Sequence, residues 1–380
     1  EFYKFLTNDF SEPMGHVQLN IEGNLNFKGL LFIPKSAPPM MFRESHDKTL
    51  HLYSNKIFIQ DNAKELLPDY LKFVKGVVDT EDLPLNVSRE VTQNSPVMGK
   101  IRNVVTGKIL SLLEEWAEND TEKYNTFFAN FGTMFKMGIN SDFTHKQRIL
   151  ELLRFESSRT EPGKYTSFKT YVSMMQSEQK EIYYILGDSR EKLERNPNLE
   201  YFQKQNIEVI FLTDPVDVFT IPYVHEFEGK QLKSIDKSDI DIPKESAPAD
   251  GLAPEMSRTV IDAFRAALGD RVEDVVESQR LVSSPVTLVG GKNAPDAQME
   301  KMMQILDKDF AASKKVLEVN MGHEIIKSLA KISLADPADP RIGRAALQLF
   351  ESALLLDGQL RSPSDFVSRM NEILSDELKK

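Results

Sequence analysis

Apolar residues recur at every third or fourth position over several long stretches of the chain, which is the spacing of amphipathic helices. The longest stretch begins at Val97 and ends at Trp116, and further helices are expected at 122–135 and 145–153. Because these three patterns follow one another closely, they predict an all-helical connector. Trp116, the only tryptophan, is expected to lie in the core at the end of its apolar stripe.

Shorter segments before that connector alternate apolar and polar residues or run apolar, as strands do. Residues 16–21 and 25–33 are separated by a Glu-Gly-Asn turn, so they predict a β-hairpin. Residues 50–59 are a third strand candidate, and residues 62–78 show helical spacing. The first part of the chain is therefore expected to be α/β.

A second α/β unit is expected after the connector. Residues 167–175 and 190–205 have helical patterns, whereas 181–186 and 207–212 are short apolar runs typical of buried strands. A strand, a helix and a strand joined by short connections predict a parallel pair with a right-handed crossover. Residues 217–225 are expected to form a helix or turn with Phe219 and Tyr223 on one side.

The segment 234–251 is rich in Pro, Ser, Asp and Lys, which indicates a linker. Beyond it the pattern predicts a helix at 254–268, a strand pair around 272–276 and 286–288, and a helix at 294–306 that is rich in methionine.

The last hundred residues end in two amphipathic helices joined by a short turn, a pattern that predicts an antiparallel hairpin. The first helix covers 342–356, and the second follows Ser362-Pro-Ser-Asp365, which resembles a capping box with proline at the first helical position. Such a hairpin can pair with a second copy in a four-helix bundle or pack against its own domain. The residues expected at the interface in the first case are Leu347, Phe350, Leu354, Phe366, Met370, Ile373 and Leu374.

Together these patterns predict an α/β fold, α+β overall: two α/β sandwich units joined by a helical connector, followed by an α+β C-terminal dimerisation domain. A chain of 380 residues exceeds what one core usually supports, so several domains are expected. The expected limits are 1–110 for the large α/β unit, 111–160 for the connector, 161–233 for the small α/β unit, 234–251 for the linker and 252–380 for the dimerisation domain.

Composition narrows the class of protein. A formal net charge of −11 argues against generic nucleic-acid binding, which uses basic surfaces. The absence of cysteine excludes disulfides and thiol nucleophiles within the chain. No apolar run is long enough to span a bilayer, so no membrane association is expected. The chain begins Glu-Phe-Tyr-Lys, without a signal-peptide pattern, and is expected to be the middle of a longer protein.

The usual catalytic motifs fail when they are compared residue by residue. The Gly290-Gly-Lys-Asn293 stretch lacks both the first glycine and the final hydroxyl residue of a phosphate-binding P-loop. There is no His-Glu-x-x-His pair, no Gly-x-Ser-x-Gly elbow and no cysteine to hold zinc. The chain alone is therefore predicted to hold no complete active site, no metal and no cofactor.

One polar segment, residues 81–94, differs from its surroundings. Its sequence is Glu-Asp-Leu-Pro-Leu-Asn-Val-Ser-Arg-Glu-Val-Thr-Gln-Asn, and Pro84 predicts a shaped loop. Arg89 offers a permanent charge and a planar fork of donors suited to phosphate oxygens. The simpler interpretation is a helix start with Arg89 in a surface ion pair.

Residues 83–90, Leu-Pro-Leu-Asn-Val-Ser-Arg-Glu, resemble the catalytic-loop signature of the heat shock protein 90 chaperones. The resemblance covers nearly the whole chain and is greatest to the bacterial HtpG type of that family. It rests also on Phe27-Lys-Gly-Leu-Leu-Phe-Ile-Pro34, Leu71-Lys-Phe-Val-Lys-Gly-Val-Val-Asp79, Ile182-Tyr-Tyr-Ile185 and Phe366-Val-Ser-Arg-Met-Asn371.

By this resemblance, the chain is the middle and C-terminal part of an ATP-dependent, stress-response chaperone, and an N-terminal domain that precedes it binds ATP with Mg²⁺. Arg89 then matches the arginine that contacts the ATP γ-phosphate, and Gln93 and Asn86 match polar residues that support the loop. The chain alone is expected not to hydrolyse ATP, so whether to class it as an enzyme stays open.

The resemblance also implies surfaces for partly folded client proteins and a homodimer, with other chaperones as further partners. Phe10 takes the place of an aromatic residue linked to client contact, and Phe219 stands where the family has a tryptophan. The loop residues Met40, Met41 and Phe42 are expected either to contact clients or to fold back on the core. The remaining residues expected to contact clients are Tyr223, Met299, Met302, Met303 and Leu306.

The chain ends Asp-Glu-Leu-Lys-Lys, unlike the acidic pentapeptide of eukaryotic cytosolic members and unlike an endoplasmic-reticulum retention signal. The resemblance therefore implies a bacterial cytoplasmic protein, with an organellar form as the alternative. The rival functional hypothesis is a dimeric scaffold that binds clients regardless of nucleotide.

Overall fold

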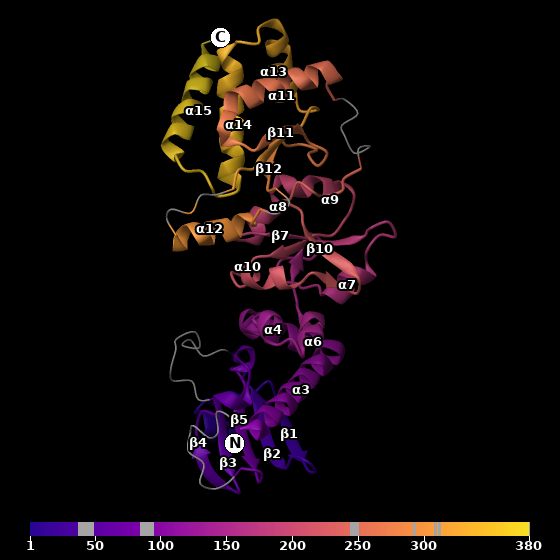
Figure 1. The fold of residues 1–380 in the computed structure, drawn as a ribbon, viewed down its shortest axis with the longest axis vertical. Helices are drawn as coiled ribbons and strands as arrows, with labels where there is room; N and C mark the ends of the chain where they lie inside the picture. Colours follow the sequence, from indigo (N-terminus) through magenta and orange to yellow (C-terminus); the bar gives the residue numbers. More distant parts are fainter. Residues whose placement is uncertain are drawn as a thin grey trace. The chain divides into compact units, whose positions relative to one another are not determined.

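The computed structural model describes residues 1–36, 49–83, 95–243, 251–291, 294–307, 310 and 313–379 (Figure 1). The chain divides into two compact units. The first unit contains Glu1–Arg154, Tyr165–Thr170 and Phe219–Phe227, and the second contains Phe155–Lys164, Tyr171–Val218 and Glu228–Lys380. Both units combine helices with mixed sheets, so the predicted α/β class, α+β overall, is confirmed. The five domain limits stay predictions.

The first unit contains a five-stranded sheet in the order β1-β2-β5-β3-β4. The predicted hairpin is confirmed, because β1 pairs with β2 in antiparallel register. The single strand expected at 50–59 is wrong: Asn55 and Lys56 both adopt positive φ values, which is the geometry of a tight hairpin turn between two strands. The strands are β1 (Gly15–Ile21), β2 (Phe27–Ile33), β3 (Leu50–Ser54), β4 (Ile57–Gln60) and β5 (Lys75–Thr80).

The helix expected at 62–78 is also wrong. Two short 3₁₀ turns, η1 (Lys64–Leu66) and η2 (Asp69–Leu71), precede β5 there. Pro68 lies between the turns and cannot continue a helix that begins before it. Leu66, Leu67, Tyr70, Leu71 and Val74 are all at most 3% exposed, so their spacing reflects apolar residues that short turns bring into the core rather than an amphipathic helix.

The helices that the long apolar stripes predict are present in the first unit. Trp116 is 5% exposed, as expected for a core residue, and the rings of Phe73 and Phe131 stack with their centroids 4.7 Å apart. The helices are α1 (Phe2–Thr7), α3 (Pro96–Asn119), α4 (Thr121–Lys136), α5 (Gly138–Ser141), α6 (Lys146–Leu152) and the 3₁₀ turn η4 (Ile221–Tyr223). Two further helices, α7 (Phe168–Ser173) and α10 (Asp217–Thr220), have residues in both units.

A second five-stranded sheet has the order β6-β8-β7-β10-β9. The predicted parallel pair is confirmed, since β7 and β8 run parallel, and β10 is parallel to β7 on its other side. The single helix expected at 190–205 is broken at Pro197. The elements are β6 (Glu156–Ser157), β7 (Glu181–Leu186), α8 (Arg190–Glu194), η3 (Pro197–Leu199), α9 (Glu200–Lys204), β8 (Ile210–Leu212), β9 (Glu226–Phe227) and β10 (Lys230–Ser234).

The C-terminal part of the second unit has a three-stranded sheet in the order β11-β13-β12. The predicted pairing of its first two strands is wrong, because β13 lies between them, parallel to β11 and antiparallel to β12. Helices α11, α13 and α14 share one core with this sheet, including Phe264, Leu329 and Phe350. The elements are α11 (Pro254–Leu268), η6 (Gly269–Arg271), β11 (Asp274–Glu277), β12 (Val286–Val289), α12 (Ala297–Leu306), β13 (Val316–Val319), α13 (Glu324–Ala335), α14 (Pro340–Leu356) and α15 (Pro363–Leu378).

Candidate functional site

The loop that carries Asn86, Arg89 and Gln93 lies outside the described residues, but the structure describes the chain on both sides of it. On the N-terminal side, Asp82 accepts a hydrogen bond from the Asn26 amide at 2.6 Å. The next residue, Leu83, is 3% exposed, and its carbonyl accepts a hydrogen bond from the Ser54 hydroxyl at 2.8 Å. The chain therefore leaves β5 from a fixed position on the sheet.

On the C-terminal side, the chain enters α3 at an equally fixed position. Ser95 is the N-cap residue and Pro96 occupies the first helical position, where its missing N–H is not needed. Met98 and Ile101 are at most 1% exposed, so one side of the first two turns of α3 packs into the core. The described chain is therefore fixed both before and after residues 84–94.

In the same unit, Tyr70, Asp142 and His145 form a polar group that the sequence patterns did not indicate. Tyr70 donates to the Asp142 carboxylate at 2.8 Å, and His145 Nδ1 lies 3.0 Å from the same carboxylate. Burial opposes ionisation of Asp142, but the hydrogen bonds from Tyr70 and His145 hold its pKa below the ordinary value. Burial, followed by the bond to Asp142, raises the pKa of Tyr70. The group has no serine or cysteine for His145 to activate, and it fixes the turn before α6 on η2.

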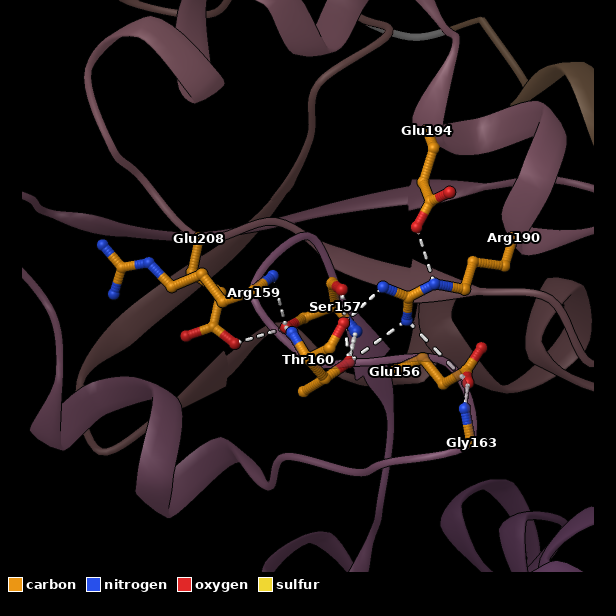
Figure 2. A network of polar contacts seen from close by, with 8 residues as sticks. All are labelled: Glu156, Ser157, Arg159, Thr160, Gly163, Arg190, Glu194 and Glu208. Atoms are coloured by element: carbon orange, nitrogen blue, oxygen red, sulfur yellow. Dashed lines mark hydrogen bonds and ion pairs between the residues drawn. The ribbon is translucent and has the colours of Figure 1, made fainter.

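A second polar network joins residues 156–163 to Arg190 of α8 and to Glu208 (Figure 2). Arg190, at the start of α8, donates to the carbonyl of Thr160 and contacts Glu194 at 2.7 Å. Ser157 donates to the buried Glu208 carboxylate at 2.6 Å. This serine is 0% exposed, so a substrate has no access to it. The network therefore has the properties of a structural support rather than of a catalytic site.

Neither network provides a metal site. Among the described residues, no group of three or more His, Asp and Glu side chains could hold a metal ion. In the same part of the chain, no helix is both long enough and apolar enough to cross a membrane.

The predicted client-contact residues of the first unit are exposed wherever the structure describes them. Phe10 is 84% exposed, Phe219 44% and Tyr223 46%, which is unusual for aromatic side chains in a folded unit. Met40, Met41 and Phe42 lie outside the described residues. Phe5, which the sequence patterns did not indicate, is 83% exposed.

The predicted client-contact residues of the second unit divide into two groups on α12. Met299 and Met302 are half-buried, whereas Met303 and Leu306 are exposed. Ile305 is 79% exposed, and it was not included in the sequence analysis. We use "α12 surface" for Met303, Ile305 and Leu306.

The predicted hairpin of α14 and α15 is confirmed as an element. Arg369 pairs with Glu351 at 2.6 Å and Arg344 pairs with Asp376 at 2.8 Å, so the two helices are joined along their length. Of the residues predicted at a dimer interface, Phe350 is buried in the core of its own domain. Leu347, Leu354, Phe366 and Ile373 are half-buried, and Met370 and Leu374 are exposed.

Comparison with known proteins adds the family relation. The family model described as Hsp90 protein matches residues 1–380. Relatives named "Chaperone protein HtpG" are 51% identical in Chlorobium phaeovibrioides, 49% in Chlorobaculum tepidum and 38% in Geobacter metallireducens. Each alignment covers 98% of this chain, but only 60%, 60% and 58% of the respective relative. The chain thus spans about 60% of the length of the curated relatives that it matches.

Proposed function

The chain belongs to the Hsp90 family of chaperones, and on this basis we propose that it acts as part of an ATP-dependent chaperone that binds partly folded proteins. The observation that carries the proposal is the match of the family model to the whole of residues 1–380. We propose that ATP with Mg²⁺ binds to a domain outside this chain. This chain is proposed to supply an arginine to the ATP site, the surfaces that bind clients and the contact between the two copies of a dimer.

Arg89 is the residue that we assign to the ATP γ-phosphate. A guanidinium group binds phosphate oxygens with two parallel N–H donors and stabilises the negative charge that spreads over the transferring phosphoryl group. The anchored flanks at Leu83 and Pro96 support this assignment, because an arginine can supply such stabilisation only from a defined position. Gln93 and Asn86 are proposed to hold the loop in the conformation that presents Arg89.

The assignment of Arg89 is tested by the rate of ATP turnover in the chain joined to the ATP-binding domain of a relative. Arg89→Ala is expected to lower kcat by about a hundredfold or more, the effect of removing one donor to a developing oxyanion. Arg89→Lys is expected to recover only part of the rate, since it keeps the charge but loses the planar fork. The control is Arg102→Ala, an exposed arginine in the first turns of α3. An Arg89→Ala rate equal to that of the control contradicts the assignment.

The client surfaces are proposed to be Phe10 with Phe219 and Tyr223 in the first unit, and the α12 surface in the second. Exposed aromatic and aliphatic side chains suit segments of unfolded chains, which present many different apolar groups. Met40, Met41 and Phe42 are proposed to contribute to the same role. Other chaperones are a further proposed class of partner.

The protein is proposed to be a homodimer through α14 and α15. The exposed apolar side chains of α15, including Met370 and Leu374, support this proposal, because one hairpin leaves that face uncovered. We propose the bacterial cytoplasm as its location, in keeping with the bacterial relatives.

A second candidate function is a dimeric scaffold that binds clients regardless of nucleotide. The observation in its favour is that the α12 surface is already exposed in the chain by itself.

A further inference from the structure

Helix α12 is attached to the rest of the second unit mainly through polar contacts at its N-terminal half. Its apolar side chains are half-buried or exposed. In contrast, Glu300 is 1% exposed and accepts hydrogen bonds from the Ser313 amide at 2.9 Å and the Gln359 side chain at 3.3 Å. These two bonds hold α12 to the C-terminal part of the second unit.

The same end of α12 also contacts the segment that follows β10. We use "exit segment" for residues 235–238, which the sequence patterns assigned to a linker. Ile235 is fully buried in the core around β7. The Arg280 guanidinium donates to the carbonyls of Ile235 and Lys237, and is itself paired with Glu318 at 3.0 Å. The exit segment is therefore fixed, not flexible, over these residues.

The backbone of the exit segment pairs with the chain that leads into α12. The Gly290 amide donates to the Asp236 carbonyl at 2.8 Å, and the Ser238 amide donates to the Gly290 carbonyl at 2.9 Å. This pairing brings the side chain of Lys237 to the start of α12.

Lys237 is the central contact. Its ammonium group lies 3.1 Å from the Asp296 carboxylate and donates to the Ala294 carbonyl. Asp296 is the N-cap residue of α12. The side chains of Lys237 and Asp296 are only 12% and 15% exposed, so solvent screens this ion pair far less than it screens a surface pair.

A weaker contact lies one turn further along α12. Lys301 is 3.6 Å from Asp188, the second residue after β7, and Asp188 is already paired with Lys192 at 2.7 Å. The segments that follow the parallel strands β7 and β10 thus each provide a charged residue that pairs with α12 or its N-cap residue.

We propose that Lys237 couples the β7–β10 sheet to the α12 surface, by holding the first turn of α12 on the exit segment so that Met303, Ile305 and Leu306 are presented in an ordered helix. The functional part of this inference rests on the proposed client role of the α12 surface. A helix that is already ordered binds a client without the loss of conformational entropy that ordering during binding would require. Removal of the ammonium group takes away the cation that pairs with Asp296, while the repulsion between Asp296 and Asp236 remains, which favours release of the helix end.

Amide hydrogen exchange of the full chain, read at residues 297–306, tests the coupling. Lys237→Met is expected to speed exchange in α12 by at least about tenfold at neutral pH while the amides of β7 stay protected. The matched control is Lys233→Met. Lys233 lies on β10, its side chain is 23% exposed, and its ion pairs among the described residues are with Glu181 and Asp239, neither of which belongs to α12. Lys301→Met is expected to give a smaller increase, since its ion pair is longer. Unchanged exchange in α12 of Lys237→Met overturns the proposal.

A double-mutant cycle shows whether Lys237 acts through Asp296. In an Asp296→Asn background, Lys237→Met is expected to change the rate of amide exchange in α12 by less than about threefold, because the negative charge that Lys237 pairs with is already absent. An equally large effect in both backgrounds overturns the direct coupling.

Client affinity is measured separately, with a reduced and alkylated globular protein that cannot refold. Lys237→Met is expected to weaken its binding about threefold or more, and Lys233→Met is expected to leave it unchanged. Faster exchange without weaker binding supports the coupling and contradicts the client role of α12, so failure of the coupling and failure of the proposed function give different results.

Discussion

Asp296 shows how one buried carboxylate makes stability depend on pH. Burial and the neighbouring Asp236 raise its pKa to about 6, although Lys237 favours the ionised form. An unfolded chain releases this proton near pH 4. Between about pH 4 and pH 6 the folded protein therefore holds the proton more tightly than the unfolded chain does. The contribution of Asp296 to the free energy of unfolding falls as pH rises through this window, and it stays low above it.

Replacement of the Asp296 carboxylate by an amide removes this loss in the free energy of unfolding at higher pH. Asp296→Asn is expected to raise the free energy of unfolding by about 1–2 kcal/mol at pH 7.5, and to have almost no effect at pH 4. The amide oxygen can still accept a hydrogen bond from Lys237. Denaturant unfolding at the two pH values measures the change, and Asp262→Asn, at an exposed aspartate of α11, is the control. A gain that is equal at both pH values contradicts the assigned cause.

At the scale of elements, amphipathic helices were the most predictable part of the fold. The pattern at 254–268 matches α11 residue for residue, and the stripe at 97–116 lies within α3. Each of these helices has one face toward a core and one toward solvent, so three-and-four spacing identifies it. Short turns can give the same spacing without forming a helix, which explains the failure at 62–78.

Short elements and long-range contacts were not predictable. β13 has only four residues, Val316–Val319, and it was not identified in the sequence analysis. Its place between β11 and β12 depends on pairing with residues up to 42 positions away, as Asp274 is from Val316. The contact of Lys237 with Asp296 was missed for the same reason. The assignment of Arg89 came from resemblance to a family, because local spacing alone favoured a surface ion pair.

The α14–α15 hairpin yields a prediction about oligomeric state. A chain that stops at Arg341 would be a poor test, because α14 contributes Ala346, Phe350 and Ala353 to the domain core. Met370→Glu with Leu374→Glu instead places two charges on the exposed apolar face of α15.

This double variant is expected to be a monomer of about 43 kDa in light scattering at micromolar concentration, whereas the unchanged chain is expected to have twice that mass. Asn371→Glu, an exposed polar position of α15, is the control and should remain dimeric. A dimer that persists in the double variant rules out α15 as the interface.

At the scale of the whole molecule, the question is whether nucleotide and client communicate. In the chain joined to an ATP-binding domain, ATP is expected to change client affinity about fivefold or more, the usual range of coupling between two sites. Fluorescence anisotropy of a labelled, permanently unfolded client, with and without ATP, measures this change. Arg89→Ala under the same conditions shows whether the change needs hydrolysis. The scaffold hypothesis instead requires equal affinity in both states.

The central position of β13 also has a consequence for the synthesis of the protein. In the part of the chain that the structure describes, β11 and β12 each pair within their sheet only with β13, which follows both of them in sequence. During synthesis β11 and β12 leave the ribosome before β13, so their backbone groups stay unpaired until residue 319 has emerged. Exposed strand edges of this kind are prone to pair with other chains. The nascent C-terminal part therefore passes through a stage in which it resembles the partly folded proteins that this family binds.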